Sequence, residues 1–554
     1  NYIKMSKFPW LESYPDFVSH STEINYENIV EIYDQSIRNF RDKVAYKNMD
    51  VELTYNELDN HVNALIHYFQ NNTSLKKGDR IVLQMPNLLQ YPVAIFACLK
   101  AGLVIVNTNP LYTADEMLHQ YKDSGAKAVI IVENFAHNLE KIISKTDIET
   151  VIITTIGDLL GGFKGGLTNF VIRNVKKMVP AFSIPGSLNL KKILKDNSGK
   201  KGENIEIKNT DTAFLQYTGG TTGLSKGAEL THRNICANVS QVEAWIGENV
   251  DHGQEVVITA LPLYHIFALT ANCLTFFRYG SKNILITNPR DMPKFCADLK
   301  KNPFTVIKGV NTLFIGLMNQ DVFKNLNFDK LKLALGGGMA VQDIVAEQWE
   351  KLTGTALLEA YGLSETSPAA TINPWNGKHK TGSIGLPLPN TDVKILDDDF
   401  KEVKVGEPGE IAIKGPQVMK GYWNKPEETA KCMHGEYFLT GDVGVIDEEG
   451  FFKIVDRKKE MVLVSGFNVY PSEVEKAITE NSKVLEVGVC GGKNDDGTEY
   501  VQAFVVKKED SLTKEEVIET CRENLTNYKV PKVIHFRDEL PKSNVGKILR
   551  RLLK

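Results

Sequence analysis

Residues 217–227, YTGGTTGLSKG, are the segment of this chain with the clearest capacity for chemistry, with four glycines, three threonines, one serine and one lysine. Glycines free backbone N–H groups to converge on an anion, threonine hydroxyls add donors, and Lys226 supplies a positive charge. The order differs from the common P-loop, because Ser225 rather than glycine precedes Lys226. The segment predicts a phosphate-binding loop of another type. A flexible linker is the alternative, although a linker does not require this order of residues.

The same segment contains a formal G-x-S-x-G, which raises the alternative of a hydrolase with Ser225 as nucleophile. That chemistry requires a strand that leads directly into a sharp turn at the serine. The strand-like run TAFLQY lies upstream, but threonine and glycine residues separate it from Gly223. The spacing therefore disfavours a nucleophile at Ser225.

The composition of the whole chain limits the classes of protein to which this loop can belong. The chain of 554 residues is longer than an ordinary domain with one hydrophobic core, so two or more domains are expected. The net charge of -4 gives no electrostatic reason to expect a nucleic-acid partner. The seven cysteines are scattered, with no C-x-x-C and no spacing typical of metal ligands, which favours reduced thiols in a cytoplasmic setting. The N-terminal residues lack the apolar core of a signal peptide.

The elements that must position the loop alternate between two patterns. Residues 53–70 have the spacing of an amphipathic helix, whereas AKAVIIVE and TVIITT are continuous apolar and β-branched runs. Such runs fit strands buried on both faces of a helix-covered parallel sheet. The apolar stretch at 92–106 is shorter than the roughly 20 residues that a bilayer needs, and it predicts a core helix followed by a buried strand. The sequence predicts an α/β protein with a large N-terminal domain of layered α/β subdomains and mostly parallel sheets.

The pattern changes after about Val455, where DRKKEMVLVSGFNVYPSEVEKAI leads into a smaller segment with strand-like and helix-like runs. A domain boundary is expected near Asp456. We expect an N-terminal domain at 1–455, a hinge at 456–459 and a small mobile α+β domain at 460–554.

Residues 161–186 have a composition of their own. Apolar residues recur at nearly helical spacing, and the basic residues Lys164, Arg173, Lys176 and Lys177 occur without an acidic residue among them. This composition is typical of a helix at a membrane interface. The alternative is a surface helix that packs its apolar side on the large domain.

The loop at 217–227 resembles the phosphate loop of the adenylate-forming superfamily, which contains acyl-CoA synthetases, adenylation domains and luciferases. Further segments match the remaining motifs of that superfamily in sequence order, namely LTYNELD (53–59), LKAGLVIVNTNPLY (99–112), LPLYHIFAL (261–269), LGGGMA (335–340), YGLSETSP (361–368), FLTGDVG (438–444), VDRKKEMVLVSGFNVYPSEVE (455–475) and LPKSNVGKILRR (540–551). The resemblance covers the chain from about residue 25 to the C-terminus and is nearest to the bacterial long-chain fatty acyl-CoA synthetases.

The resemblance implies an ATP site with Mg²⁺ as cofactor. Thr221 and Glu365 would be the protein ligands of the ion, which prefers oxygen donors. The implied ATP contacts are Thr218, Gly219, Gly220, Thr221, Thr222, Gly223 and Lys226 at the phosphates, Gly336, Gly337, Gly338 and Tyr361 at adenine, Asp442 and Arg457 at the ribose, and Gly362 and Thr366 nearby. Alone, Glu365 would more often be a solvated loop acid, and Asp442 a turn former.

The resemblance also bears on the acid that is activated. Amino-acid-activating relatives have an aspartate just after the LP segment, whereas LPLYHIFAL has none, so a substrate ammonium would be buried without a counter-charge. Acetate-specific relatives have a tryptophan at the position of Gly362, and a glycine there leaves the acyl tunnel open to a long chain. His265 resembles the residue at the entrance of the acyl pocket, although a lone histidine in an apolar run is usually structural.

The C-terminal motifs imply a second half-reaction. Lys547 resembles the lysine that the superfamily delivers to the α-phosphate and the acyl carboxylate, while a solvated basic tail is the alternative. Gly466 would lie beside the route of the CoA pantetheine, and the small domain would rotate about Asp456 between the two steps. Gly219 and Ser225 stand where many relatives have serine and proline, and GEYFLTGD lacks the tryptophan usual in the fatty acyl signature.

The resulting hypothesis is a fatty acyl-CoA synthetase of the AMP-forming type, with a long-chain fatty acid, ATP and CoA as substrates. A medium-chain or aryl acyl-CoA ligase is the nearest alternative. A luciferase-like oxygenase, a serine hydrolase using Ser225 and a catalytically silent protein of the same fold are more remote. We expect a cytoplasmic protein, and we leave open its association with the inner face of the membrane through 161–186 and its assembly as a homodimer.

Overall fold

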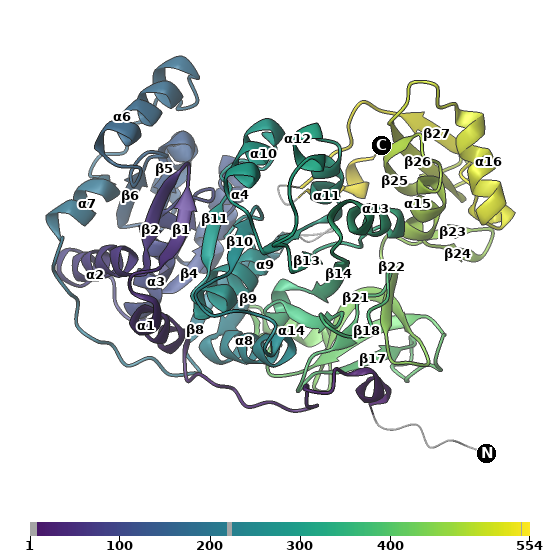
Figure 1. Cartoon of the computed structure of the whole chain (residues 1–554), viewed down its shortest axis with the longest axis horizontal. Helices are drawn as coiled ribbons and strands as arrows, with labels where there is room; N and C mark the ends of the chain where they lie inside the picture. Colours follow the sequence, from purple (N-terminus) through teal and green to yellow (C-terminus); the bar gives the residue numbers. More distant parts are fainter. Residues whose placement is uncertain (1–7, 219–223, 544–545, 554) are drawn as a thin grey trace.

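The computed structural model describes residues 8–218, 224–543 and 546–553, which form a large α/β body and a smaller unit at the C-terminus (Figure 1). One large sheet has the spatial order β19-β9-β8-β4-β3-β5-β6-β7. From β8 to β7 the neighbours are parallel, whereas β9 and β19 are antiparallel additions at one edge. Its strands are β3 (Arg80–Gln84), β4 (Val104–Asn107), β5 (Ala128–Val132), β6 (Thr150–Thr154), β7 (Leu188–Asn189), β8 (Thr212–Thr218), β9 (Lys226–Thr231) and β19 (Gly421–Tyr422).

A second large sheet has the order β16-β15-β14-β13-β12-β10-β11-β1-β2. Its central strands from β14 to β1 are parallel, and antiparallel strands close both edges. Its strands are β1 (Val44–Asn48), β2 (Val51–Thr54), β10 (Val256–Thr259), β11 (Lys282–Leu285), β12 (Val306–Gly309), β13 (Leu333–Gly336), β14 (Leu357–Gly362), β15 (Ala369–Ile372) and β16 (Leu386–Pro387).

Helices cover these sheets, and local sequence explains where they begin. In α2 (Tyr55–Asn72), Thr54 and Glu57 form a capping box that satisfies two free backbone N–H groups. The apolar stretch at 92–106 forms the buried helix α3 (Gln90–Lys100) and strand β4, which confirms the predicted helix and strand. The other helices of the large body are α1 (Ile29–Phe40), α4 (Ala114–Ser124), α5 (Ala136–Ile142), α7 (Leu190–Asp196), α8 (His232–Ile246), α9 (Ile266–Ala268), α10 (Met292–Lys301), α11 (Asn311–Met318), α12 (Asp321–Lys324), α13 (Asp343–Thr353) and α14 (Pro426–Lys431).

An antiparallel sheet joins the large body to the C-terminal unit. Its order is β17-β18-β21-β20, with β22 paired to the other part of β21. The strands are β17 (Asp392–Leu396), β18 (Gly409–Lys414), β20 (Met433–His434), β21 (Tyr437–Ile446) and β22 (Phe452–Arg457). The expected hinge at 456–459 therefore begins inside β22, because Asp456 and Arg457 are still paired with Val443 and Asp442 of β21.

The C-terminal unit has a hydrophobic core of its own, drawn from residues between Val462 and Ile534. Its elements are the hairpin β23 (Val462–Val464) and β24 (Phe467–Val469), the strands β25 (Val484–Lys493), β26 (Glu499–Lys507) and β27 (Val533–Phe536), and the helices α15 (Pro471–Thr479) and α16 (Lys514–Asn524). The predicted α/β class, with layered and mostly parallel sheets in a large body and a smaller α+β unit, is confirmed. The mobility of that unit stays a prediction.

The basic and apolar segment forms α6 (Gly162–Phe170) and the short π-helix η4 (Val171–Val175), which project at one side of the large body (Figure 1). The helix is anchored on one side, where Asn169 accepts a hydrogen bond from the Gly157 N–H and donates one to Thr155, both at 2.9 Å. Phe163 is 87% exposed, Leu167 53% and Phe170 57%, so the apolar side of α6 is largely open, whereas Ile172 of η4 packs on the large body. No helix within the described residues combines the length and the apolar character needed to cross a bilayer.

Candidate active site

A cavity of about 1170 Å³ lies between the large body and the C-terminal unit. Its wall is built where parallel strands end, with Thr218 at the end of β8, Val310 just after β12, Gly337 and Gly338 just after β13, and Gly362 at the end of β14. The carboxyl ends of parallel strands are where open α/β sheets bind their ligands. Residues 542–551 of the C-terminal unit close the opposite side, apart from 544–545, which are outside the described residues.

Tyr361, which was implied at adenine, forms a connected group with the implied ribose residues Asp442 and Arg457. The Tyr361 hydroxyl donates a hydrogen bond to Oδ2 of Asp442 at 2.6 Å, and Nε of Arg457 lies 3.3 Å from Oδ1 of the same carboxylate. Asp442 and Arg457 are register partners of β21 and β22, which fixes their approach. Burial raises the pKa of Asp442, and the Arg457 charge opposes this shift. Tyr361 and Arg457 line the cavity, while Asp442 contacts both from behind.

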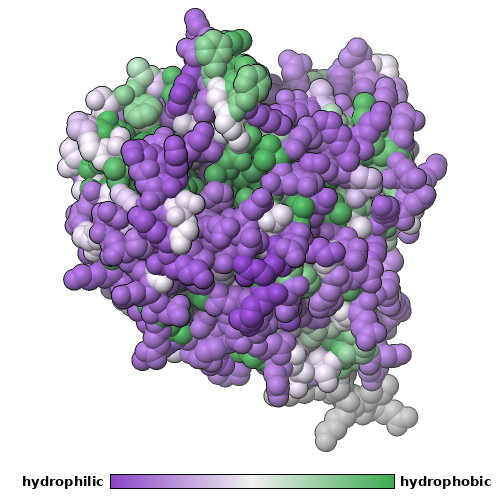
Figure 2. Space-filling model, turned by 60° about the vertical axis from the view of Figure 1, so that its left-hand side comes forward, coloured by the Kyte–Doolittle hydropathy of each residue, from purple (hydrophilic) through white to green (hydrophobic). Residues whose placement is uncertain are grey.

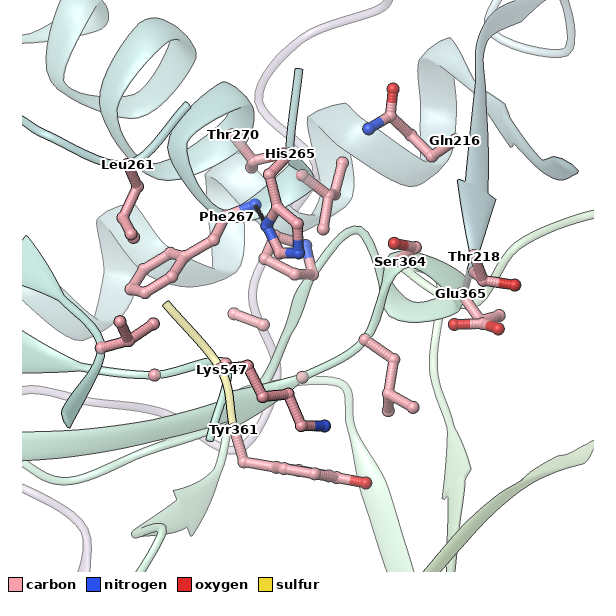
Figure 3. Close-up of a pocket in the computed structure, with 18 of the residues that line it drawn as sticks. Gln216, Thr218, Leu261, His265, Phe267, Thr270, Tyr361, Ser364, Glu365 and Lys547 are labelled. Carbon is pink, nitrogen blue, oxygen red and sulfur yellow. Dashed lines mark hydrogen bonds between the residues drawn. The ribbon is translucent and has the colours of Figure 1, made fainter. Parts of the chain in front are cut away.

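A second group lies at the base of the phosphate loop. Glu365, in the 3₁₀ turn η6 (Ser364–Thr366), is buried and accepts a hydrogen bond from the Tyr422 hydroxyl at 2.8 Å. The Nζ atom of Lys226 lies 4.5 Å from the centroid of the Tyr422 ring and 3.4 Å from Glu428. Thr218 and Glu365 both line the cavity (Figure 3). The residues Gly219, Gly220, Thr221, Thr222 and Gly223 of the same prediction are outside the described residues.

Glu365 fits the role of a Mg²⁺ ligand. Burial raises its pKa, while the Tyr422 hydrogen bond and the charges of Arg457 and Lys226 act in the other direction. A divalent cation would therefore stabilise a carboxylate that the fold holds away from water. The described residues contain no cluster of three or more His, Cys, Asp and Glu side chains arranged to hold a metal. Such a cluster is not required, because Mg²⁺ is usually held by one or two carboxylates together with substrate phosphates.

Lys547 enters the cavity from the C-terminal unit and is half-buried there (Figure 3). Its segment is shaped by hydrogen bonds between Ser543 and Lys547 and is fastened to the large body, where the Thr312 hydroxyl donates to the Gly546 carbonyl at 2.6 Å. Gly546 has a φ of +81°, and a Cβ on it would lie 2.6 Å from Thr312 Oγ1. The position therefore needs glycine both for its backbone conformation and for this close approach. Burial lowers the pKa of Lys547 to about 8.

His265 also lines the cavity (Figure 3). It precedes α9, and its Nδ1 accepts a hydrogen bond from the Phe267 N–H at 3.3 Å. Burial lowers its pKa to about 4, and the Lys547 charge acts in the same direction, so the imidazole is neutral at neutral pH. The cavity also has a set of apolar lining residues, which includes Val242, Trp245, Ile246, Phe276, Leu333, Leu335 and Leu358.

Gly336 and Gly337 occupy crowded positions, where a Cβ would lie 2.5 Å from Val341 and 2.9 Å from Phe267. Gly337 and Gly338 line the cavity, and Gly336 lies just behind them in β13. A Cβ on Gly362 would lie 1.7 Å from the Pro368 carbonyl oxygen, so the backbone itself requires glycine there. This contact is a reason for Gly362 that is independent of an open acyl tunnel. Thr366 is fully buried, and its hydroxyl accepts a hydrogen bond from the Leu363 N–H at 2.9 Å.

Asp456 and Gly466 are not part of the cavity wall, whereas Arg457, Lys458 and Lys459 of the expected hinge line it. The buried Asp456 accepts hydrogen bonds from the Ser472 N–H and from Arg550, both at 2.7 Å. Gly466 lies in the turn between β23 and β24, next to Phe467, which is 57% exposed. In this arrangement Lys547 is at the site and Gly466 is outside it.

The structure provides no support for a nucleophile at Ser225. The strand β9 begins at Lys226, immediately after it, whereas a nucleophile elbow leads from a strand into a helix. The Ser225 carbonyl accepts a hydrogen bond from Nε2 of His119 at 2.7 Å, so the nearest histidine contacts the backbone rather than the hydroxyl.

Sequence reasoning missed three residues of the site: Tyr422, Thr312 and Lys308. The first two belong to contacts between distant segments and have no local signal. Lys308 had one, because it is a lysine within the otherwise apolar strand VIKG. It lines the cavity and is 2% exposed.

Comparison with known proteins identifies the family. The sequence model described as AMP-binding enzyme matches residues 33–423, and the model described as AMP-binding enzyme C-terminal domain matches residues 473–547. A protein of Escherichia coli O157:H7 named long-chain-fatty-acid–CoA ligase is 51% identical over 548 residues, which are 98% of this chain and 97% of that protein. A protein of the same name from Bacillus subtilis is 37% identical, over 99% of this chain and 98% of its own length.

A solved structure with a similar fold is that of ATP-bound MatB from Rhodopseudomonas palustris, with a TM-score of 0.81 and 28% identity, covering 95% of this chain and 98% of that one. The relatives match nearly end to end, and the family models cover both the large body and the C-terminal unit. The chain belongs to the family of AMP-binding enzymes.

Proposed function

We propose that this enzyme uses ATP to convert a long-chain fatty acid into acyl-AMP and then transfers the acyl group to CoA. The observation that carries the proposal is the position of Lys547, which the C-terminal unit inserts between the Tyr361 end of the cavity and the His265 end. The printed names of the relatives from E. coli and B. subtilis support the long-chain substrate and the CoA acceptor. The apolar lining residues of the cavity suit an alkyl chain.

In the first half-reaction, a carboxylate oxygen attacks the α-phosphorus of ATP, and the bond from that phosphorus to the bridging oxygen breaks as pyrophosphate leaves. The attack brings anions together, so fixed positive charge at the reacting atoms lowers the barrier. Lys547 would supply this charge at the α-phosphate and the carboxylate, and Lys226 would supply it at the leaving phosphates. The neutral His265 would border the entrance of the acyl chamber. Asp442 would accept hydrogen bonds from the ribose hydroxyls, in place of the hydrogen bond that it accepts from the Tyr361 hydroxyl.

Mg²⁺ would be held by Glu365 and by the Thr221 hydroxyl of the phosphate loop. When bound, the ion neutralises charge on the phosphate oxygens and so helps pyrophosphate to leave. The burial of Glu365 and the single phenol that donates to it support this role.

In the second half-reaction, the CoA sulfur attacks the acyl carbon, the bond from that carbon to the phosphate oxygen breaks as AMP leaves, and the thiol proton passes to solvent. Lys547 fills the side of the cavity that the C-terminal unit closes. We propose that this unit rotates about Asp456, withdrawing Lys547 and bringing the Gly466 turn to the pantetheine route. The separate core of the C-terminal unit supports its movement as one body.

The experiment that tests the proposal measures ATP–pyrophosphate exchange with fatty acids from short to long, and then thioester formation with CoA. We expect exchange that depends on the fatty acid and is strongest with long chains, and a thioester only when CoA is present. A preference for medium-chain or aryl acids would show that the substrate is one of these acids rather than a long-chain fatty acid. Ester hydrolysis without ATP, lost in Ser225→Ala, or oxygen uptake with acyl-AMP would replace the reaction.

We also propose that the exposed face of α6 and η4 rests on an anionic membrane. Its exposed apolar side chains are Phe163, Leu167, Phe170 and Val175, and Met178 follows just after η4. Figure 2 shows a hydrophobic cluster on a projection at the top of the view. Lys164, Lys176 and Lys177 flank them. Arg173 is not available to lipid, because Nε and Nη2 donate to the buried Glu133 at 2.7–3.1 Å. Basic and apolar side chains together favour lipid over a second copy of this face, which would bring like charges together.

A further inference from the structure

An ion pair joins the C-terminal unit to the large body outside the cavity. Nζ of Lys476, in α15, binds Oδ2 of Asp343, the first residue of α13. The Lys476 side chain is 46% exposed and the Asp343 side chain is 28% exposed. Neither residue lines the cavity, so neither side chain contacts a substrate that is bound there.

The surroundings of Asp343 confine its carboxylate. Asp343 stands in the first turn of α13, where the helix dipole favours a negative charge. The backbone at Gly382 passes close to this side chain, because a Cβ on Gly382 would lie 2.7 Å from Oδ1 of Asp343. The large body therefore presents the carboxylate from a restricted position, and the longer side chain of Lys476 reaches it from the C-terminal unit.

Lys476 lies near the proposed pivot of the C-terminal unit. In the first turn of α15, the Ser472 N–H donates a hydrogen bond to Oδ2 of Asp456 at 2.7 Å. Lys476 follows Ser472 by one helical turn, which is roughly 6 Å along the helix axis. Since α13 belongs to the large body, a rotation of the unit about Asp456 changes the distance between Lys476 and Asp343. An ion pair requires its atoms to stay within about 4 Å, so it favours the orientation in which it is formed.

In that orientation Lys547 lines the cavity. The segment of Lys547 has its own contact with the large body, because the Thr312 hydroxyl donates to the Gly546 carbonyl at 2.6 Å. The ion pair acts instead on α15, which is a different part of the same unit. Contacts at two separate points restrict the rotation of a body more than either contact alone.

We propose that Lys476 is a positioning residue, whose ion pair with Asp343 holds the C-terminal unit in the orientation for acyl-AMP formation. The proposal rests on the proposed function. Exposed ion pairs stabilise little, but a change of about fivefold in an equilibrium needs only about 1 kcal/mol. Each orientation serves one half-reaction, so the ratio of the two rates follows the equilibrium between the orientations. This ratio is the quantity that the ion pair should change.

The test measures the two half-reactions separately in single turnovers, as acyl-AMP formation from acid and ATP and as thioester formation from synthetic acyl-AMP and CoA. Lys476→Asp places like charges together, so we expect the ratio of the first rate to the second to fall roughly fivefold or more. Lys476→Gln removes the attraction without adding repulsion and should lower the ratio by a smaller factor. Asp343→Lys should lower the ratio as Lys476→Asp does. The double variant, with Asp343→Lys and Lys476→Asp, exchanges the charges and should return the ratio to within about twofold of the wild type.

Lys483→Asp is the matched control, because Lys483 lies in the same unit and its partner Glu516, at 2.8 Å, lies in that unit too. This variant should leave the ratio as in the wild type. Equal losses in both half-reactions of Lys476→Asp, or a low ratio that the double variant does not restore, would mean that the pair only supports local structure and would overturn the proposal. Absence of acyl-AMP formation in the wild type with every acid would refute the proposed function. Both half-reactions with an unchanged ratio in Lys476→Asp would refute the role of Lys476 alone.

Discussion

The guanidinium of Arg550 donates a hydrogen bond from Nη1 to Oδ1 of Asp456 over 2.7 Å, which connects the segment carrying Lys547 to the end of β22. The same side chain binds Glu475, Glu460 and Ser472 within the C-terminal unit. The position of Lys547 in the cavity therefore depends on the orientation of the whole C-terminal unit relative to β22.

Replacing Lys547 should affect the two half-reactions unequally. We expect Lys547→Ala to slow acyl-AMP formation roughly a hundredfold or more, because a charge aimed at the transition state is lost. Thioester formation from synthetic acyl-AMP and CoA should remain nearly intact, because the unit has by then withdrawn Lys547. Single-turnover measurements of each step check this. Equal loss in both steps would contradict the rotation, and no loss in either would return Lys547 to the role of a solvated tail residue.

The first half-reaction should lose rate at alkaline pH. Burial lowers the pKa of Lys547 to about 8, so its ammonium is fully present below that pH and is lost as the pH rises through it. We expect kcat/KM for acyl-AMP formation, which reports on the free enzyme, to fall about tenfold per pH unit above 8. In Lys547→Arg this fall should disappear, whatever the remaining activity, because guanidinium stays charged. A fall that persists in the arginine variant would assign it to another group.

Gly362 should not tolerate any side chain. Its Cβ would lie 1.7 Å from the Pro368 carbonyl oxygen, so Gly362→Ala requires the backbone of β14 or β15 to move. We expect a loss of about 1–3 kcal/mol in the free energy of unfolding, as for other overpacked positions. Gly362→Trp should shorten the accepted chain if the glycine keeps the acyl tunnel open. This variant would combine the backbone clash with the blocking of the tunnel. Thermal unfolding of the alanine variant, measured beside its activity with each chain length, separates them.

Chain length is better tested deeper in the cavity. Leu358 lines the wall in the same row as Leu335, away from the Gly362 contact. We expect Leu358→Phe to lower kcat/KM for long acids at least tenfold and to leave short acids unaffected, because the added ring fills the space of the distal carbons. An unchanged chain-length profile would show that the alkyl chain does not enter this part of the cavity.

Membrane binding should depend on the exposed apolar face of α6. We expect replacement of Phe163, Leu167 and Phe170 by Ser to abolish co-sedimentation with anionic vesicles and to leave activity with dispersed fatty acid unchanged. Replacement of Lys176 and Lys177 by Ser should weaken binding by about 1 kcal/mol per residue in low salt. Arg173→Ser is the control, because Arg173 belongs to the same basic segment but its charge is already paired with Glu133. This variant should bind the vesicles as the wild type does. Binding unaffected by the serine variant of the apolar face would leave a second copy of the chain as its partner, which sedimentation velocity would detect.

Much of this protein was determined by local sequence. Continuous apolar runs such as AKAVIIVE form the buried parallel strand β5, because a strand covered on both faces has no polar side to alternate with. The loop motifs were also readable, since Thr218 and Gly362 end strands and Gly337 follows one, at the edge where a parallel sheet presents its ligand site.

Tertiary structure decided which charged side chains are paired or buried and which are free to contact a ligand or a membrane. Arg173 and Lys176 look alike in the sequence, but a carboxylate forty residues away, on Glu133, neutralises only the first. Lys308 and Lys547 are separated by most of the C-terminal half of the chain, yet both reach one cavity, one from a strand and one from a unit that closes over it. Charge, burial and partner depend on contacts between distant segments, so residue type and spacing alone could not distinguish a paired or buried side chain from a solvated one.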